Sequence, residues 1–270
     1  MLTFLKLGGS LITDKTRPYT ARVEKIQLLV REMADAIKKQ PDLQLILGHG
    51  SGSFGHQAAS QYNTRSGVKS RNEWQGFAKV WHQATALNRL VLEALHHAGI
   101  PAVTVSPFSS VTAHDGRVSE WNLFHLNKAL THGLIPVVHG DVFFDEVRGG
   151  TILSTEELFL HLGMELKPGR ILLAGLEEGI WQDYPARKNL IRDLSPNDFF
   201  QYQNSVGEGL GIDVTGGMQS KVETMLSLVQ TIPGLEVVVF SGEIMGNLEK
   251  ALWGENPGTR IYLPGVPTDS

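Results

Sequence analysis

Three glycine-rich segments of the chain carry lysine or histidine where these side chains can meet a bound anion. The first segment holds Lys6, Gly8, Gly9, Ser10 and Lys15. Adjacent glycines let backbone N–H groups approach an anion closely, and the two lysines add positive charge. This composition is typical of a phosphate-binding turn. A plain Gly-Gly turn with solvated lysines is the structural alternative.

The second segment, residues 48–56, contains four glycines and two serines in nine residues. It lies between an expected strand and an expected helix, an arrangement in which a helix N-terminus binds phosphate. It matches neither a Walker A loop nor a dinucleotide-binding fingerprint. His56 follows the loop directly, so we expect it to donate a hydrogen bond to a phosphate oxygen. For His49, inside the loop, a functional and a structural role stay equally open.

The third segment places Gly216 and Gly217 before an expected helix, with Lys221 one turn into it. A helix N-terminus carries about half a positive elementary charge, and Lys221 adds a full one. A glycine turn before an ordinary amphipathic helix is the alternative. Three such segments in one chain together favour the binding of phosphate groups.

The elements that must position these segments are short apolar runs alternating with helical patterns. The expected strands are residues 2–7, 43–47, 102–105, 135–138, 170–174 and 236–240, and the expected helices lie near 23–37, 71–97, 121–131 and 218–230. Several strands are apolar almost throughout, as in a parallel sheet that is buried on both faces. Right-handed crossovers then predict an α/β fold, a three-layer αβα sandwich with a mainly parallel central sheet.

Smaller features complete the expected organisation. Turn residues predict hairpins at 115–116 and 148–150. Residues 183–213 look irregular, either as a mobile cover over a site or as a long surface connection. No change in composition marks a linker, so residues 1–270 are expected to form one domain with a soft boundary near 167–169.

Composition and charge exclude several classes of function. The 24 basic and 28 acidic residues give a net charge of −4, which argues against a nucleic-acid binder. The chain has no cysteine, so disulfides, thiolate metal sites and cysteine catalysis are excluded. The ten histidines show no zinc-ligand spacing, and no protein metal site is expected. The absence of a long apolar run or a signal-like start predicts a soluble, cytoplasmic protein.

The three segments, in this order, resemble the amino acid kinase superfamily. Residues 6–10, 50–56 and 213–218 with Lys221 carry the resemblance, which covers nearly the whole chain. Within the superfamily, Gly-Ser-Phe-Gly-His at 52–56 is similar to isopentenyl phosphate kinases. Fosfomycin-inactivating kinases are close relatives with a similar loop histidine.

The resemblance implies transfer of the ATP γ-phosphate, with Mg²⁺, to isopentenyl phosphate. It implies catalytic roles for Lys6, Lys15 and His56, with Lys15 on the transferred group. It implies ATP contacts from Lys6, Gly8, Gly9, Ser10, Gly52, Gly217 and Lys221, and acceptor contacts from Ser51, His56 and Thr155. It further implies an acceptor lobe over about 1–166, a nucleotide lobe over about 167–270, and a homodimer.

Two departures from the family pattern leave contacts open. Ser154, Thr155 and Glu156 stand where such kinases often have Ser-Gly-Asp, so the acceptor contact there can differ. Residues 176–179 read Leu-Glu-Glu-Gly in place of Asp-Val-Asp-Gly, which leaves the nucleotide contacts of that segment open.

Two alternative functions and one alternative placement stay in view. The chain could be a kinase for another small phosphate or phosphonate such as fosfomycin, or a catalytically silent nucleotide-binding regulator. The intact lysines argue against the silent regulator. Trp74, Phe77 and Trp81 follow helical spacing, which predicts core residues first and an apolar pocket for an isoprenoid tail second.

Overall fold

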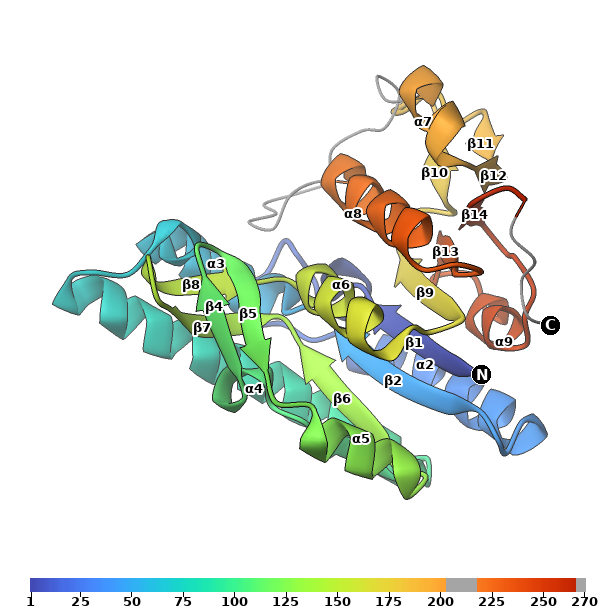
Figure 1. Ribbon diagram of the computed structural model, residues 1–270. Helices are drawn as coiled ribbons and strands as arrows, with labels where there is room; N and C mark the ends of the chain where they lie inside the picture. The colour runs from blue at the N-terminus through green and yellow to red at the C-terminus, as the bar shows by residue number, and fades with distance from the viewer. Residues whose placement is uncertain (203–217, 266–270) are drawn as a thin grey trace.

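An eight-stranded sheet runs through the molecule in the order β12-β14-β13-β9-β1-β2-β6-β3 (Figure 1). The computed structural model describes residues 1–202 and 218–265. The strands are β1 (Leu2–Leu7), β2 (Gln44–His49), β3 (Ala102–Thr104), β6 (Ile135–His139), β9 (Arg170–Gly175), β12 (Asp193–Leu194), β13 (Glu236–Ser241) and β14 (Thr259–Ile261). Among the described residues β13 and β14 pair antiparallel, and the other neighbours pair in parallel.

Helices cover both faces of this sheet because its strands are apolar on both sides. On one face lie α2 (Val23–Lys39), α4 (Arg71–His97) and α9 (Asn247–Leu252), and on the other lie α5 (Phe124–Thr131), α6 (Thr155–Leu166) and α8 (Met218–Thr231). Within β1, Phe4 packs into one core cluster and Leu5 into the other. Figure 1 shows α6 and α8 in front of the sheet and α2 and α4 behind it. The predicted three-layer αβα sandwich is therefore confirmed.

The parallel register brings two of the glycine-rich segments together. Lys6 pairs with Gly48 and Leu7 with His49, so β1 and β2 end at the same edge of the sheet. Helix α1 (Gly9–Ile12) follows β1, and α3 (Gly52–Tyr62) follows β2. Neighbouring strands lie about 4.8 Å apart. The two turns after them must therefore lie side by side.

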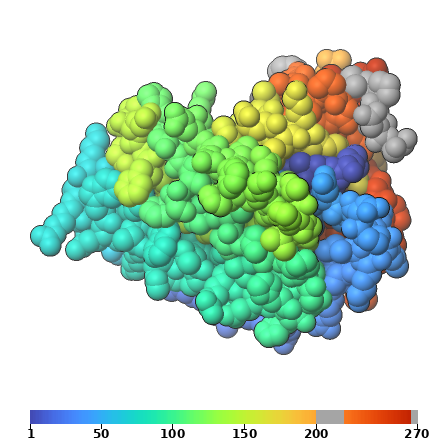
Figure 2. Space-filling view, turned by 60° about the horizontal axis from the view of Figure 1, so that its bottom comes forward, coloured from blue at the N-terminus to red at the C-terminus, as the bar shows by residue number. Residues whose placement is uncertain are grey.

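A four-stranded sheet stands beside the main one in the order β5-β4-β7-β8. Its strands are β4 (Val111–His114), β5 (Arg117–Trp121), β7 (Asp141–Asp145) and β8 (Gly149–Leu153), and they form the two predicted hairpins. In the space-filling view of Figure 2 these hairpins, green to yellow-green, lie with cyan α4 on the left, and orange α8 lies at the upper right.

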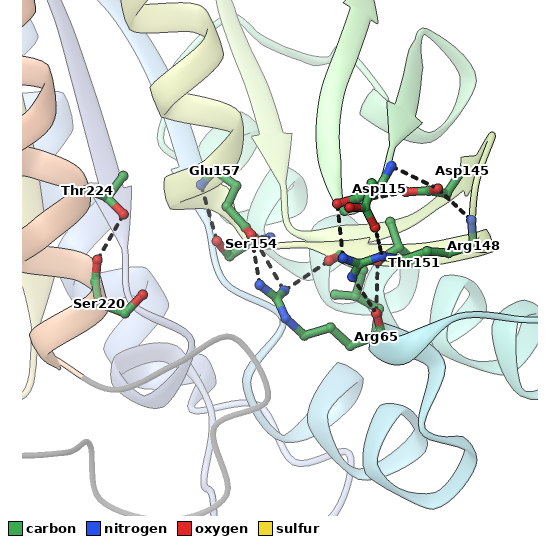
Figure 3. A network of polar contacts seen from close by, with 11 residues as sticks. Arg65, Asp115, Asp145, Arg148, Thr151, Ser154, Glu157, Ser220 and Thr224 are labelled. Atoms are coloured by element: carbon green, nitrogen blue, oxygen red, sulfur yellow. Dashed lines mark hydrogen bonds and ion pairs between the residues drawn. The ribbon is translucent and has the colours of Figure 1, made fainter.

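Asp145 ties the turns of both hairpins together. Its carboxylate accepts hydrogen bonds from the backbone N–H groups of Asp115, Gly116, Val147 and Arg148, at 2.7 to 3.1 Å. Burial would raise the pKa of Asp145, but these donors outweigh it and lower the pKa. Figure 3 shows this cluster beside Arg148, which also pairs with Asp115 at 2.9 Å. Strand β8 leads from this cluster into α6.

Two expectations about local structure need correction. The helix expected over 121–131 begins at Phe124, because Trp121 is the last residue of β5. The part of the irregular segment that the structure describes contains β11 (Leu190–Ile191), β12 and α7 (Pro196–Tyr202). Residues 203–213 of that segment lie outside the described residues. The other expected strands and helices are confirmed, and the helix at 71–97 has the predicted bounds.

Candidate active site

A pocket lies at the edge of the sheet where β1 and β2 end. It is lined by most of the residues that the sequence singled out, namely Lys6, Gly9, Ser10, Lys15, Ser51, Gly52, His56, Thr155 and Lys221. Gly8 does not line the pocket, and its N–H donates to the Ala174 carbonyl at 2.8 Å. Gly217 lies outside the described residues. Segments from both halves of the chain thus meet in one place.

The two glycine-rich turns pack backbone against backbone. A Cβ atom on Gly9 would lie 2.5 Å from the Gly52 nitrogen, and one on Gly50 would lie 2.8 Å from the Gly9 nitrogen. Gly52 has a φ of +48°, in the left-handed region that favours glycine. Larger residues are therefore excluded at these three positions, and the backbones of the two turns lie close together.

Helix α3 begins inside the second turn, so its N-terminus faces the pocket. The N–H groups of Phe54 and Gly55 donate to the Ser51 carbonyl at 3.1 and 3.3 Å. Ser51 is the N-cap residue, but its hydroxyl makes no capping hydrogen bond. His56 is the fifth residue of α3 and lines the pocket. The positive end of the α3 dipole favours a bound anion, and the His56 side chain can donate a hydrogen bond to it.

Helix α6 also directs its N-terminus at the pocket, and a capping box fixes where it begins. Ser154 accepts from the Glu157 N–H at 3.2 Å, and Glu157 accepts from the Ser154 N–H at 2.6 Å. Arg65, which follows α3, pairs with Glu157 at 2.8 Å (Figure 3). This contact joins the segment after the second turn to the start of α6. Thr155 and Glu156 are then the first two helical residues and line the pocket.

Glu156 is the site residue whose role the sequence did not reveal. Its side chain is buried, contacts Lys6, and lies 3.7 Å from the Lys221 ammonium. Burial would raise the pKa of Glu156, but attraction to Lys6 and Lys221 outweighs it and lowers the pKa. The ionised carboxylate thus holds a lysine of β1 and a lysine of α8 at one pocket. The available signal was an acidic residue two positions after the Ser154 cap.

Thr155 supports the site through its hydroxyl. This hydroxyl donates to the His49 carbonyl at 2.7 Å and accepts from the Gly140 N–H at 3.1 Å. Both of its hydrogen-bonding directions are used to join α6 to the ends of β2 and β6. The hydroxyl hydrogen and one lone pair are thus used, which leaves the second lone pair and the methyl group of Thr155 to contact a bound molecule.

His49 has a structural place beneath the second turn and does not line the pocket. Its ring is fully buried, stacks on His139 at 5.3 Å, and lies 3.1 Å from the side-chain oxygen of Asn88. Burial, reinforced by repulsion from His139, lowers the pKa of His49 to about 3. The ring is therefore neutral near pH 7. Of the two roles left open for His49, these contacts favour the structural one.

The described residues offer few metal ligands and no membrane-crossing helix. In residues 1–202 and 218–265, no group of three or more His, Asp or Glu side chains is placed to hold a metal ion. Over the same residues, the helices are too short or too polar to cross a bilayer.

Comparisons with known proteins identify the family to which the chain is similar. The model of the amino acid kinase family matches residues 1–241. Isopentenyl phosphate kinase of Methanocaldococcus jannaschii is 33% identical over 267 residues, covering 97% of this chain and 98% of the relative. Isopentenyl phosphate kinase of Methanothermobacter thermautotrophicus is also 33% identical, covering 96% and 98%. A crystal structure of an isopentenyl phosphate kinase superposes with a TM-score of 0.82 at 29% identity, covering 97% of this chain and all of that one.

The low pKa of His49 predicts a loss of stability in acid. The unfolded chain binds a proton at His49 near pH 6.5, while the folded protein does so only near pH 3. Between these values the unfolded state holds one more proton, so stability falls by up to about 1.4 kcal/mol per pH unit as pH decreases. Urea unfolding of wild type and His49→Gln at pH 7, 6 and 5 should show this slope in wild type only. Parallel pH profiles would contradict the assignment.

Proposed function

The chain belongs to the amino acid kinase family, and we propose that it transfers the γ-phosphate of ATP to isopentenyl phosphate, giving isopentenyl diphosphate and ADP. The observation that carries the proposal is a pocket where two glycine turns, three lysines and His56 meet, in a chain that matches isopentenyl phosphate kinases over nearly its whole length. Such an enzyme acts in isoprenoid biosynthesis, and the family resemblance supports a cytoplasmic homodimer.

Phosphoryl transfer between two anions requires charge neutralisation and in-line alignment more than covalent chemistry. Lys6 and Lys221, with the turn at Gly9 and Ser10, are assigned to the ATP phosphates. The N-terminus of α3, which includes Ser51 and His56, is assigned to the acceptor phosphate. Lys15 is assigned to the group in transit, where it neutralises the charge on the equatorial oxygens. An acceptor that is already a phosphate needs no strong general base.

The other expected contacts are less direct. Gly52 serves the ATP side through its close approach to Gly9, and Gly8 shapes the turn while its N–H bonds Ala174. Gly217 stays assigned to ATP by resemblance. Thr155 borders the acceptor, but its hydroxyl hydrogen and one lone pair are used within the protein. We further propose that about 1–166 forms the acceptor lobe and about 167–270 the nucleotide lobe.

Magnesium fits this site chiefly as a companion of ATP. Two carboxylate residues, Glu156 and Asp141, line the pocket. Glu156 is held by two lysines, and Asp141 lies 3.4 Å from His139. Neither carboxylate is positioned as a dedicated ligand, so phosphate oxygens and water would complete the coordination of Mg²⁺. The bound ion would supply additional positive charge to the phosphates.

The apolar wall of the pocket suits an acceptor with a hydrocarbon tail. Ala59, Val80 and Ile152 line it. Phe77 is buried behind this wall, in one core cluster with Val80 and Ile152. Trp81 is 38% exposed and packs on Phe108. Phe77 therefore belongs to the core and Trp81 to the surface. We assign Val80 of the same helix as the residue that faces the tail.

A screen of acceptors tests the proposal. ADP release should be measured with isopentenyl phosphate, dimethylallyl phosphate, fosfomycin and free amino acids. We expect the highest kcat/KM with isopentenyl phosphate. A preference for fosfomycin would support the alternative kinase, and ATP binding without turnover of any acceptor would support the silent regulator.

His56 is predicted to stabilise charge on the acceptor side during transfer. Replacement by alanine removes a preorganised donor, which lowers rates by about 10²–10³-fold. His56→Gln should retain part of the activity because an amide still donates a hydrogen bond. Steady-state kinetics of both variants measure this, and an unchanged kcat/KM for His56→Ala would contradict the role.

Glu156 is predicted to position Lys6 and Lys221 for ATP. Glu156→Gln removes the charge between two cations, so we expect a raised KM for ATP and a kcat lower by about 10²-fold. Glu156→Asp, which keeps a carboxylate, should recover part of both. The neighbouring Glu157→Gln is the control, because Glu157 caps α6 without lining the pocket. A loss of stability alone in Glu156→Gln, with normal kinetics, would refute the positioning role.

The assignment of the tail wall predicts a change in chain-length preference. Val80→Ala opens space beside the tail and should shift preference toward longer isoprenyl phosphates, at a cost of about 2 kcal/mol in stability. Trp81→Ala, one position along α4, should leave chain-length preference unchanged. Rates with acceptors of five, ten and fifteen carbons measure the shift. Equal profiles for the two variants would rule out the assigned wall.

A further inference from the structure

The hydroxyl of Thr13 bridges the two glycine turns through two hydrogen bonds. Thr13 is the C-cap residue of α1 and is 1% exposed. Its hydroxyl donates to the Gly9 carbonyl at 2.7 Å and accepts from the Ser53 N–H at 2.9 Å. One bond reaches back into the turn after β1, and the other reaches the first turn of α3.

The bridge lies beside a close contact between the two turns. A Cβ atom on Gly52 would lie 2.5 Å from the Gly9 carbonyl oxygen, so no side chain can act as a spacer there. The donor and acceptor directions of the Thr13 hydroxyl are both used, which fixes its rotation. The hydroxyl therefore defines how far the Gly9 carbonyl and the Ser53 N–H lie from each other.

The same bridge anchors the segment that carries Lys15. Thr13 forms an isolated β-bridge with Ala21, and the Asp14 N–H donates to the Thr20 carbonyl at 2.9 Å. The Ser53 hydroxyl in turn lies 3.4 Å from the Thr20 carbonyl oxygen. Residues 13–21 are thus closed onto the start of α3, and Lys15 stands two residues from the bridge.

We propose that Thr13 is a positioning residue that sets the separation of the donor-phosphate turn and the acceptor-phosphate turn during transfer. The inference rests on the proposed kinase function. Each turn keeps its own backbone N–H groups and its own side chains without the bridge, so each substrate still binds. In-line transfer is far more sensitive, because a displacement of about 1 Å can cost about 10²-fold in rate. Loss of the bridge should therefore lower kcat and leave both KM values nearly unchanged.

Thr13→Val tests this directly, since valine keeps the shape of threonine and removes both hydrogen bonds. We expect kcat with isopentenyl phosphate to fall about 10²-fold, with KM for ATP and for the acceptor within about threefold of wild type. Thr13→Ser keeps the hydroxyl and should restore kcat to within about threefold.

Thr259→Val is the matched control. Thr259 is equally buried, and its hydroxyl donates to the Ile191 carbonyl at 2.5 Å and accepts from the Ile180 N–H at 2.8 Å, outside the pocket. This variant should lose the same kind of hydrogen bonds and show a decrease in Tm similar to that of Thr13→Val. Its kcat should stay within about twofold of wild type. If Thr13→Val keeps the wild-type kcat, or changes only a KM, the positioning role is wrong.

A structural readout separates this inference from the proposed function. Absence of wild-type turnover with isopentenyl phosphate would contradict the proposed function alone. Crystal structures of wild type and Thr13→Val would then decide on Thr13. The inference predicts that the Gly9 carbonyl oxygen and the Ser53 nitrogen move apart in the variant. An unchanged separation would overturn it.

Discussion

The close approach of the Gly9 turn to the Gly50–Gly52 turn is the constraint on which the rest of the site depends. Two parallel strands end in register, so the turns after them lie one strand spacing apart. A Cβ atom on Gly9 would already collide with Gly52. Because these residues are glycines, the backbones of both turns line the same pocket. In the proposed function, the donor and acceptor phosphates meet there, with no side chain from these glycine positions between them.

Charge balance is the second requirement, because three lysines and the positive end of a helix dipole repel one another when they share a pocket. Glu156 meets this requirement from inside the protein. It is buried, ionised and shared by Lys6 and Lys221, which come from opposite ends of the chain. Glu156 therefore preorganises Lys6 and Lys221 at the pocket, so less reorganisation accompanies the proposed binding of phosphate.

Local patterns in the sequence predicted the strands, the long helix and the glycine turns, because each depends on neighbours within a few residues. The role of Glu156 depends on β1, α6 and α8 meeting, and no local pattern carries that information. Phe77, Val80 and Trp81 lie on one helix, but only tertiary packing determines their environments. Phe77 lies in the core, Val80 lines the pocket, and Trp81 is on the surface. The prediction that a helix begins at residue 121 was wrong for the same reason, because Trp121 belongs to β5 and pairs with Val111 of β4.

The most direct test of this account is a crystal structure with a non-hydrolysable ATP analogue, Mg²⁺ and isopentenyl phosphate bound together. We expect the acceptor phosphate against Ser51 and His56, the γ-phosphate beside Lys6 and Lys15, and the reacting atoms about 3–3.5 Å apart and in line. An acceptor phosphate bound away from the N-terminus of α3, or a γ-phosphate directed away from it, would contradict the account.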